Sequence, residues 1–349
     1  MLDEKSLNDY LVESNFRGRI EKTIEGNAGY VYILDNGENV APRRIAIKSI
    51  NLHRKNKEVG SEEIKRFKRE VEQWYKYRHN ELILTPFIIK IIQNIPFIAM
   101  PYCDCDLREY MKNENSFTDC LIVSIQICHA LNYARTKGLV SHQDLKPENI
   151  LLQDLHRMYV EKYPFRWKVQ LSDFGLANAF QEIGLRNGSR PYMAPEQYNS
   201  SSDLSKVDVF AVGVILHELF TGYHPIEEKT LDVWPNPLAV KGNKWKHEKV
   251  WKIWSQEKNK NCSRINDEAL RLVIESMISS EAELRPYLVD VEKRLINMLK
   301  NIDDYLFRTI EMYLNYFDEI ATTSENEDEK IHDSYAEKQI SQFSKILMK

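Results

Sequence analysis

Hydrophobic residues follow two different patterns along the chain, and the pattern changes near Tyr102. Before that point, short apolar runs bounded by polar or glycine-containing turns predict strands. These runs cover residues 19–23, 30–34, 44–50, 87–92 and 95–100. Between the third and fourth runs, apolar residues recur mostly at three- and four-residue spacing from Ser61 to Tyr75, which predicts one helix.

After Tyr102 the apolar spacing becomes mainly helical. Residues 118–137 form a long periodic segment, and residues 207–221 are largely apolar, which predicts a helix buried at the centre of a larger lobe. The sequence therefore predicts an α+β protein with two lobes, in which a small β-rich lobe precedes a larger helical lobe.

A third periodic segment begins at Val291 and runs to Ile320 in steps of three or four residues. It predicts one long helix, followed by an acidic loop at residues 325–329 and a last short helix that reaches Leu347. A helix of this length must bury its apolar stripe against something. It either packs against the larger lobe or associates with a second copy of the chain, and we favour packing within the chain.

Length, charge and cysteine content narrow the class of protein. The chain has 349 residues, which predicts two or three domains or lobes, and its net charge of -4 gives no reason to expect nucleic acid or an anionic membrane as a partner. Five cysteines without a framework-like spacing predict free thiols. Residues 1–16 lack the apolar stretch of a signal peptide, and no apolar run is long enough to span a membrane, so we expect a cytoplasmic protein.

The segment from Ser141 to Leu152, SHQDLKPENILL, carries the clearest chemistry. It follows the long periodic segment and leads into an apolar strand. Asp144 can orient an attacking hydroxyl, Lys146 can neutralise charge on a phosphate, and Asn149 can bind a metal through its amide oxygen. Any one of these residues alone is more often part of a polar surface turn.

Two further motifs follow in chain order. Asp173 stands in the run Leu-Ser-Asp-Phe-Gly after a predicted strand, and its carboxylate suits Mg²⁺ because hard cations prefer oxygen ligands. Residues 188–196, GSRPYMAPE, close this part of the chain.

A glycine-containing turn precedes all of these motifs. It runs from Ile24 to Val31 and contains Gly26 and Gly29, which let backbone N–H groups approach phosphate oxygens. On its own, such a turn between two strands is more often structural.

Lys48 ends the strand-like run Ile-Ala-Ile-Lys that follows the turn. A lysine in this place can reach phosphates if a carboxylate orients it. Glu70 in the predicted helix is our candidate for that carboxylate, and Glu63 and Glu72 compete with it.

In this order and at these spacings, the motifs resemble those of the eukaryotic-type protein kinase family. That family combines a glycine-rich loop, a Val-Ala-Ile-Lys lysine, a His-Arg-Asp-Leu loop with its asparagine, Asp-Phe-Gly and Ala-Pro-Glu. The later run from Asp208 to Gly213 fits as well. The resemblance implies an N-terminal arm at 1–15, a kinase domain at 16–301 (N-lobe 16–100, hinge 101–103, C-lobe 104–301) and a helical tail at 302–349.

The resemblance also implies roles for individual residues. Asp144 would be the catalytic aspartate, helped by Lys146, and Lys48 would pair with Glu70 and hold the phosphates of ATP. Asn149 and Asp173 would hold two Mg²⁺ ions. The residues implied to line the ATP site are Ile24, Gly26, Gly29, Val31, Ala46, Lys48, Met100, Pro101, Cys103 and Leu151.

Two structural roles come from the same resemblance. Glu196 would form an ion pair with Arg285, and Asp208 would anchor the catalytic loop from its buried helix. Lys146, two places after Asp144, and the Gly-Ser pair at 188–189 resemble kinases that act on serine and threonine, so we expect a protein substrate with such an acceptor.

The sequence departs from the family in the activation segment. Gln143 replaces the arginine that usually precedes the catalytic aspartate, and residues 174–188 contain no serine, threonine or tyrosine. We therefore expect a kinase that does not need phosphorylation of this segment. Ile24 also stands where the family has its first loop glycine, which should loosen ATP binding without abolishing it.

Three alternatives stay open on the residues alone. A small-molecule kinase shares a similar catalytic loop but generally lacks the Ala-Pro-Glu segment, and an inactive scaffold should have lost Lys48, Asp144, Asn149 or Asp173, all of which are present. Tryptophans that alternate with lysines at 223–266 can bind nucleic acid. Their position in the family pattern favours an amphipathic helix with a solvated lysine face.

Overall fold

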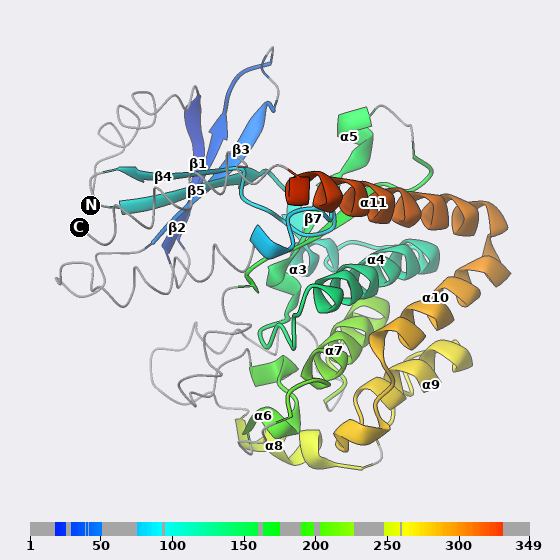
Figure 1. The fold of residues 1–349 in the computed structure, drawn as a ribbon. Coiled ribbons are helices and arrows are strands. Elements are labelled where there is room, and N and C mark those ends of the chain that lie inside the picture. Colours follow the sequence, from blue (N-terminus) through cyan, green and yellow to red (C-terminus); the bar gives the residue numbers. More distant parts are fainter. Residues whose placement is uncertain are drawn as a thin grey trace. The chain divides into compact units, whose positions relative to one another are not determined.

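The computed structural model of the chain describes residues 18–25, 29–38, 40, 42–50, 75–92, 95–159, 163–174, 190–198, 203–226, 248–258 and 260–330. It divides into two compact units (Figure 1). The smaller unit comprises Met1–Cys103 with Ile320–Lys349, and the larger unit comprises Asp104–Glu319. The expected α+β class is confirmed, with a sheet in the first unit and mainly helices in the second.

The smaller unit is built on one antiparallel sheet whose strand order is β1-β2-β3-β5-β4. The strands are β1 (Arg19–Glu25), β2 (Gly29–Asp35), β3 (Arg44–Ile50), β4 (Ile88–Ile92) and β5 (Ile95–Pro101). One face carries a buried hydrophobic cluster made of Leu34, Ile45, Ile47, Phe97 and Ala99. The helix expected from Ser61 lies almost wholly outside the described residues.

The larger unit contains a small three-stranded sheet, ordered β6-β7-β8, and most of the helices. Its strands are β6 (Cys105–Asp106), β7 (Ile150–Asp154) and β8 (Trp167–Leu171). Its helices begin with α3 (Leu107–Tyr110), α4 (Phe117–Thr136), η1 (Pro147–Asn149), α5 (Leu155–Tyr159), η3 (Arg190–Tyr192) and α6 (Pro195–Tyr198). They continue with α7 (Val207–Thr221), α8 (Glu248–Gln256), α9 (Glu268–Met277), η5 (Ala282–Leu284), α10 (Leu288–Ile302) and α11 (Asp304–Lys330).

Helix α7 is the buried helix that its apolar composition predicts, since its residues from Val207 to Leu219 are all buried. Gly213 lets it approach the end of α9 closely. A Cβ atom added at Gly213 would lie 2.8 Å from the Cβ atom of Met277 and 2.8 Å from a side-chain carbon of Ile278, so a larger residue would force the two elements apart. The helix ends at Gly222, whose positive φ of 72° is a common helix stop.

The prediction of one long helix after Val291 is wrong, because the chain breaks between α10 and α11 at Asp303. Asp303 is extended (φ -149°, ψ 98°), and its side chain accepts a hydrogen bond from the backbone N–H of Leu306 at 2.9 Å. This is the geometry of a helix N-cap, for which aspartate is a preferred residue. The apolar period continues across the break and therefore hides it.

The predicted acidic loop at residues 325–329 is also wrong, because α11 continues to Lys330. Three of these five residues are glutamates, which have a favourable helix propensity and do not end a helix by themselves. The short helix expected to reach Leu347 lies outside the described residues.

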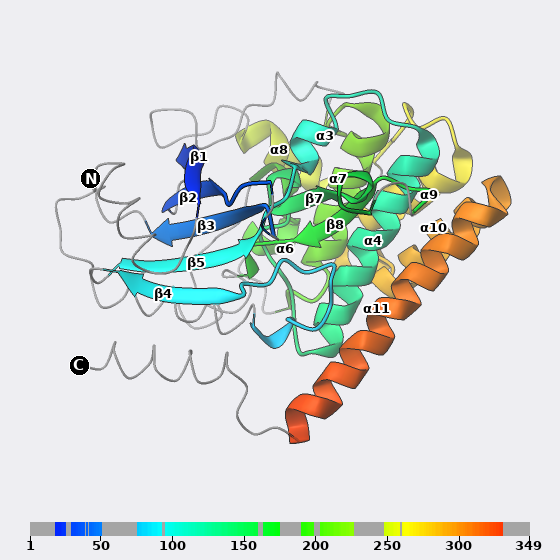
Figure 2. The same ribbon diagram turned by 90° about the horizontal axis from the view of Figure 1, so that it is seen from above.

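The apolar stripe of α11 packs within the chain. Ile310, Tyr313, Leu314 and Phe317 are buried, and Figures 1 and 2 both show this helix running beside α4. The rings of Tyr163 and Phe165, in the link between β7 and β8, lie 5.4 and 5.1 Å from that of Tyr313. The expectation of a packed link and an intramolecular tail helix is thus confirmed for these residues, while self-association stays a prediction.

A histidine fixes α11 to the rest of the larger unit. His129 on α4 places Nδ1 at 2.7 Å from Oε1 of Glu292 on α10 and Nε2 at 3.2 Å from Oδ1 of Asp318 on α11. Burial alone would lower the pKa of His129, but the hydrogen bonds to Asp318 and Glu292 raise it to about 9. The charged ring therefore joins three helices at one point.

The structure also bears on the expectations for the cysteines and for membrane-spanning segments. None of the five cysteines forms a disulfide, as their number and spacing predict. Within the ranges given above, no helix combines the length and the hydrophobicity that a membrane span requires.

We predict that the contribution of His129 to stability depends on pH. A histidine whose folded-state pKa is raised stabilises the fold fully below its unfolded pKa of about 6.5, and this stabilisation disappears as pH rises through about 9. His129→Gln should lower the free energy of unfolding by about 3 kcal/mol at pH 6 and by far less at pH 10. Urea unfolding across this range measures the difference.

Asn132→Ala supplies the matched control. Asn132 donates to the same carboxylate, Glu292 Oε2, at 2.6 Å, but it does not titrate. Its effect should therefore stay constant from pH 6 to pH 10. A loss in His129→Gln that is equally independent of pH would show that the ring acts without its charge.

Candidate active site

The sheet of the smaller unit gathers five of the ten predicted ATP-site residues on one face. Lys48 on β3 lies directly opposite Val31 on β2, and Val31 lies opposite Ile24 on β1. Ala46, two residues before Lys48 on the same strand, lies opposite Met100 on β5. Side chains directly opposite each other, or two residues apart on one strand, share a face of a sheet.

This face is the one opposite the hydrophobic cluster, because the cluster residues Ile45 and Ile47 alternate with Ala46 and Lys48 along β3. Ile24 is 43% exposed, whereas Ala46 and Met100 are buried. The face therefore combines an apolar floor with one cationic side chain, a composition that suits a flat heterocycle linked to phosphates.

The residues expected to form the hinge follow directly. Pro101 ends β5 opposite Ile45, and Cys103, which forms no disulfide, is half-buried at the end of the smaller unit. Gly29 begins β2. Gly26 and Glu70 lie outside the described residues, as do the competing glutamates, so the pairing of Lys48 with Glu70 stays a prediction.

In the larger unit, the loop from Ser141 to Asn149 brings three predicted residues together. Nζ of Lys146 donates to Oδ2 of Asp144 at 3.2 Å. The amide nitrogen of Asn149 donates to the backbone oxygen of Asp144 at 2.8 Å and to its Oδ2 at 3.3 Å. A lysine and an amide donor thus orient one carboxylate, a pair of contacts that the sequence analysis did not predict.

The hairpin of β7 and β8 brings Asn149 close to Asp173. Ile150 pairs with Leu171, so the residues just before β7 and just after β8 lie at the same end of the hairpin. The backbone N–H of Ser172 donates to the backbone oxygen of Asn149 at 2.9 Å, and its hydroxyl donates to the same oxygen at 3.0 Å. Leu151, predicted to lie against adenine, is the second residue of β7 and is half-buried.

These residues fit a Mg²⁺ site. The amide nitrogen of Asn149 is used by Asp144, which leaves the amide oxygen as a ligand, and Asp173 adds a carboxylate. Oxygen donors of this kind are what Mg²⁺ prefers, and it usually binds through one or two protein groups together with substrate phosphates.

A buried aspartate on α7 holds the loop in place. Oδ2 and Oδ1 of Asp208 accept hydrogen bonds from the backbone N–H of His142 at 2.8 and 3.0 Å, and Oδ1 also accepts from that of Gln143 at 3.2 Å. Burial raises the pKa of Asp208, and nearby His142 opposes this effect. The expected anchoring of the loop by Asp208 is therefore present.

Backbone strain is concentrated in the same place. Of the described residues other than glycine, Gln143 and Asp173 have positive φ angles, of 66° and 61°. Such conformations cost of order 1 kcal/mol each and cluster at functional sites, where surrounding contacts enforce them. Here, the hydrogen bonds that Asp208 accepts and the pairing of β7 with β8 supply those contacts.

The Ala-Pro-Glu segment is fixed at two points. Glu196 forms the predicted ion pair with Arg285, with two hydrogen bonds of 2.5 and 2.9 Å. Gln197 adds a contact that our motif reading missed, since its amide nitrogen donates to the backbone oxygen of Gln143 at 3.1 Å. The one signal in the sequence was a polar residue directly after the motif.

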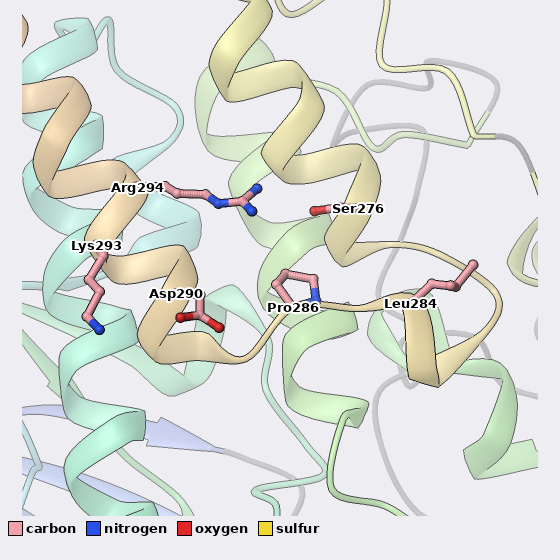
Figure 3. Close-up of a pocket in the computed structure, with 6 residues that line it drawn as sticks. All are labelled: Ser276, Leu284, Pro286, Asp290, Lys293 and Arg294. Atoms are coloured by element: carbon pink, nitrogen blue, oxygen red, sulfur yellow. The ribbon is translucent and has the colours of Figure 1, made fainter.

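A separate pocket lies elsewhere in the larger unit, around η5 and α10. It is lined by Ser276, Leu284, Pro286, Asp290, Lys293 and Arg294 (Figure 3). None of these lining residues is a predicted site residue. The lining mixes both charge signs and gives no chemistry that would compete with the loop around Asp144.

Comparison with known proteins gives one family. The family model described as protein kinase domain matches residues 20–294. A probable serine/threonine-protein kinase PknB of Lactococcus lactis is 28% identical over 220 residues, which cover 60% of this chain and 32% of that protein. The interferon-induced, double-stranded RNA-activated protein kinase of Mus musculus is 38% identical over 132 residues, covering 35% and 23% of the two chains.

A third relative, the serine/threonine-protein kinase PrkC of Bacillus subtilis, is 27% identical over 210 residues, which cover 58% of this chain and 30% of that protein. The matched part of the chain thus spans about a third or less of the length of these curated relatives.

We predict that Asp208 is needed for the stability of the larger unit. Asp208→Ala would leave the N–H groups of His142 and Gln143 buried without their acceptor, so the free energy of unfolding should fall by about 3 kcal/mol. Urea unfolding followed by tryptophan fluorescence measures this loss. Glu283→Ala, at an exposed position, should change stability by less than about 0.5 kcal/mol, and equal losses in both variants would contradict the anchoring role.

Proposed function

Because the chain belongs to the protein kinase domain family, we propose that it transfers the γ-phosphoryl group of ATP to serine or threonine hydroxyls of a protein substrate. The observation that carries the proposal is the loop in which Lys146 and Asn149 both hydrogen-bond the carboxylate of Asp144. The matching family model and the names of the relatives support the same conclusion.

In this proposal Asp144 accepts a hydrogen bond from the substrate hydroxyl and aims its oxygen at the phosphorus atom. Phosphoryl transfer needs mainly positioning and charge stabilisation, so a correctly oriented acceptor contributes much of what the protein can offer. Lys146, beside Asp144, offsets the negative charge of the transferring group. The hydrogen bonds that Asp208 accepts from the backbone keep the loop from reorganising during the reaction.

Asn149 and Asp173 bind Mg²⁺ in this proposal, two ions in all, and the metal supplies positive charge to the phosphates. Lys48 contacts the phosphates from the sheet face of the smaller unit, and Glu70 orients it. Ala46, Met100 and the chain from Pro101 to Cys103 bind the adenine end, with Leu151 from β7. Ile24, Gly26, Gly29 and Val31 cover the phosphates.

We propose further that residues 16–301 form the kinase domain and 302–349 a tail, in a cytoplasmic protein that binds no nucleic acid. The extent of the family match, at 20–294, and the end of α10 at Ile302 support these bounds. A small-molecule substrate is less well supported, because the Ala-Pro-Glu segment is built into the site through Gln197 and Arg285.

We predict that Asp144→Asn abolishes phosphoryl transfer while it preserves the fold. Asparagine has the same size but accepts a hydroxyl proton poorly, so transfer of labelled γ-phosphate to a serine peptide should fall about a thousandfold. Asp304→Asn, at a 53% exposed carboxylate of α11, should leave the rate unchanged. Equal transfer by wild type and Asp144→Asn, or transfer to tyrosine peptides alone, would contradict the proposal.

We propose that activity does not require phosphorylation of the activation segment. The absence of serine, threonine and tyrosine between residues 174 and 188 supports this, and so does Gln143 in place of a phosphate-binding arginine. The backbone oxygen of Gln143 accepts a hydrogen bond from the side chain of Gln197, so this residue is held by a contact within the protein.

A phosphatase experiment tests this point. Enzyme treated with a broad-specificity protein phosphatase, and confirmed by mass spectrometry to be unphosphorylated, should transfer phosphate from the first turnover without a lag. Enzyme first incubated with ATP serves as the control. A lag that ends when a phosphate appears on Ser189 would contradict the proposal.

A further inference from the structure

Helix α11 carries a second apolar stripe, on a different side from the one that packs within the chain. Tyr305, Met312 and Tyr316 are 68%, 74% and 57% exposed. They are seven and four positions apart. At about 3.6 residues per turn, all three therefore lie within about 20° of one line along the helix. We name these three residues the outer stripe.

The outer stripe is separate from the contacts that hold α11 to the larger unit. The buried residues of α11 are centred roughly a third of a turn away around the helix, at Ile310, Tyr313, Leu314 and Phe317. Figure 2 shows α11 running along α4, and packing through the buried residues leaves the outer stripe in water. Single exposed apolar residues are common, but three large ones on one line of a helix are typical of an interaction surface.

Two opposite charges accompany the outer stripe on the same side of it. Arg308 lies about 60° and Glu319 about 40° around the helix from the line of the stripe. Both residues are exposed, and the guanidinium of Arg308 bonds Asp304 on its own helix at 2.8 Å. Arg308 and Glu319 are eleven positions apart, which is about 16 Å along the helix, so they cannot meet within one copy.

We propose that the outer stripe binds the outer stripe of a second copy of the chain, with the two α11 helices antiparallel and Met312 at the two-fold axis. Positions equally far before and after Met312 then face each other. Tyr316 faces Arg308 of the second copy, and Glu319 faces Tyr305 of the second copy. The proposal does not depend on the proposed kinase function.

An antiparallel pair brings the charged sides of both helices together. Arg308 of one copy then lies about 4.5 Å along the axis from Glu319 of the other, and symmetry forms this ion pair twice. A parallel pair would instead place the charged side against the opposite side of the stripe, where Thr309 lies, and would match neither charge. The charges therefore favour the antiparallel arrangement.

The self-complementary pattern points to a second copy and not to an unrelated partner. An apolar line with opposite charges in matching places satisfies itself about a two-fold axis, and a different protein would require no such match. The contact is small, since this part of α11 is about 24 Å long and roughly 10 Å wide, whereas a standard interface covers about 800 Å² on each partner. The dimer should therefore be reversible, with a dissociation constant of about 10 to 100 μM.

Sedimentation equilibrium of the full chain tests the pairing. Between about 1 and 200 μM, the average mass of wild type should rise from that of one chain toward that of two. Met312→Glu places two carboxylates at the axis and should weaken association about tenfold or more. Leu272→Glu, at a 54% exposed leucine of α9, removes an apolar side chain elsewhere and should associate like wild type.

Reversing the charges gives a sharper test. Arg308→Glu alone puts only glutamates in the two ion-pair places, and Glu319→Arg alone puts only arginines there. Each protein should therefore associate about tenfold more weakly than wild type. An equal mixture of the two variants restores both pairs with opposite charges and should associate as strongly as wild type. Loss of a contact inside one chain would not be restored by mixing.

All of these variants replace exposed side chains, so their urea unfolding at low concentration should match that of wild type closely. Three outcomes would overturn the proposal. They are a wild-type chain that is monomeric at every concentration, undiminished association of Met312→Glu, and a mixture that associates no more strongly than its components. The first outcome would assign the outer stripe to another occupant, such as residues 331–349 of the same chain.

Discussion

The carboxylate of Asp208 is the contact on which the larger unit of the molecule depends. It is buried on the central helix α7 and accepts the backbone N–H groups of two consecutive loop residues, His142 and Gln143. Through these hydrogen bonds, a rigid, apolar helix fixes the conformation of a polar loop. The loop needs such support because one of its residues has a positive φ, which is unfavourable by itself. The position of Asp144 follows from it.

The β7–β8 hairpin fixes the second half of the loop in the same way. Its register sets Asn149 opposite Ser172, so that one candidate metal ligand ends the loop and the other, Asp173, begins the next segment. Gln197 and Arg285 then tie the Ala-Pro-Glu segment to this arrangement. Each polar group is fixed by an element that owes its own stability to apolar packing.

Motif order was enough to predict the two-part architecture and the residues around Asp144, because each motif is local and its spacing is preserved. Periodicity was misleading at Asp303, where the apolar stripe stays in phase across a helix break that only the capping geometry reveals. It also gave no sign of the contact between Arg108 and Glu218. The bond from Arg108 to Glu218 joins residues more than a hundred positions apart, and a single sequence taken alone contains no signal for such a pair.

The contact between the link after β7 and helix α11 bears on where this protein can be divided. Tyr163 and Phe165 lie against Tyr313, so the hairpin that carries the candidate metal ligands and the helix beyond the family-matched region share one apolar core. A shortened chain that stopped at the end of α10 would leave these rings facing water. For expression or domain transplantation, the smallest self-sufficient larger unit therefore includes the first half of α11.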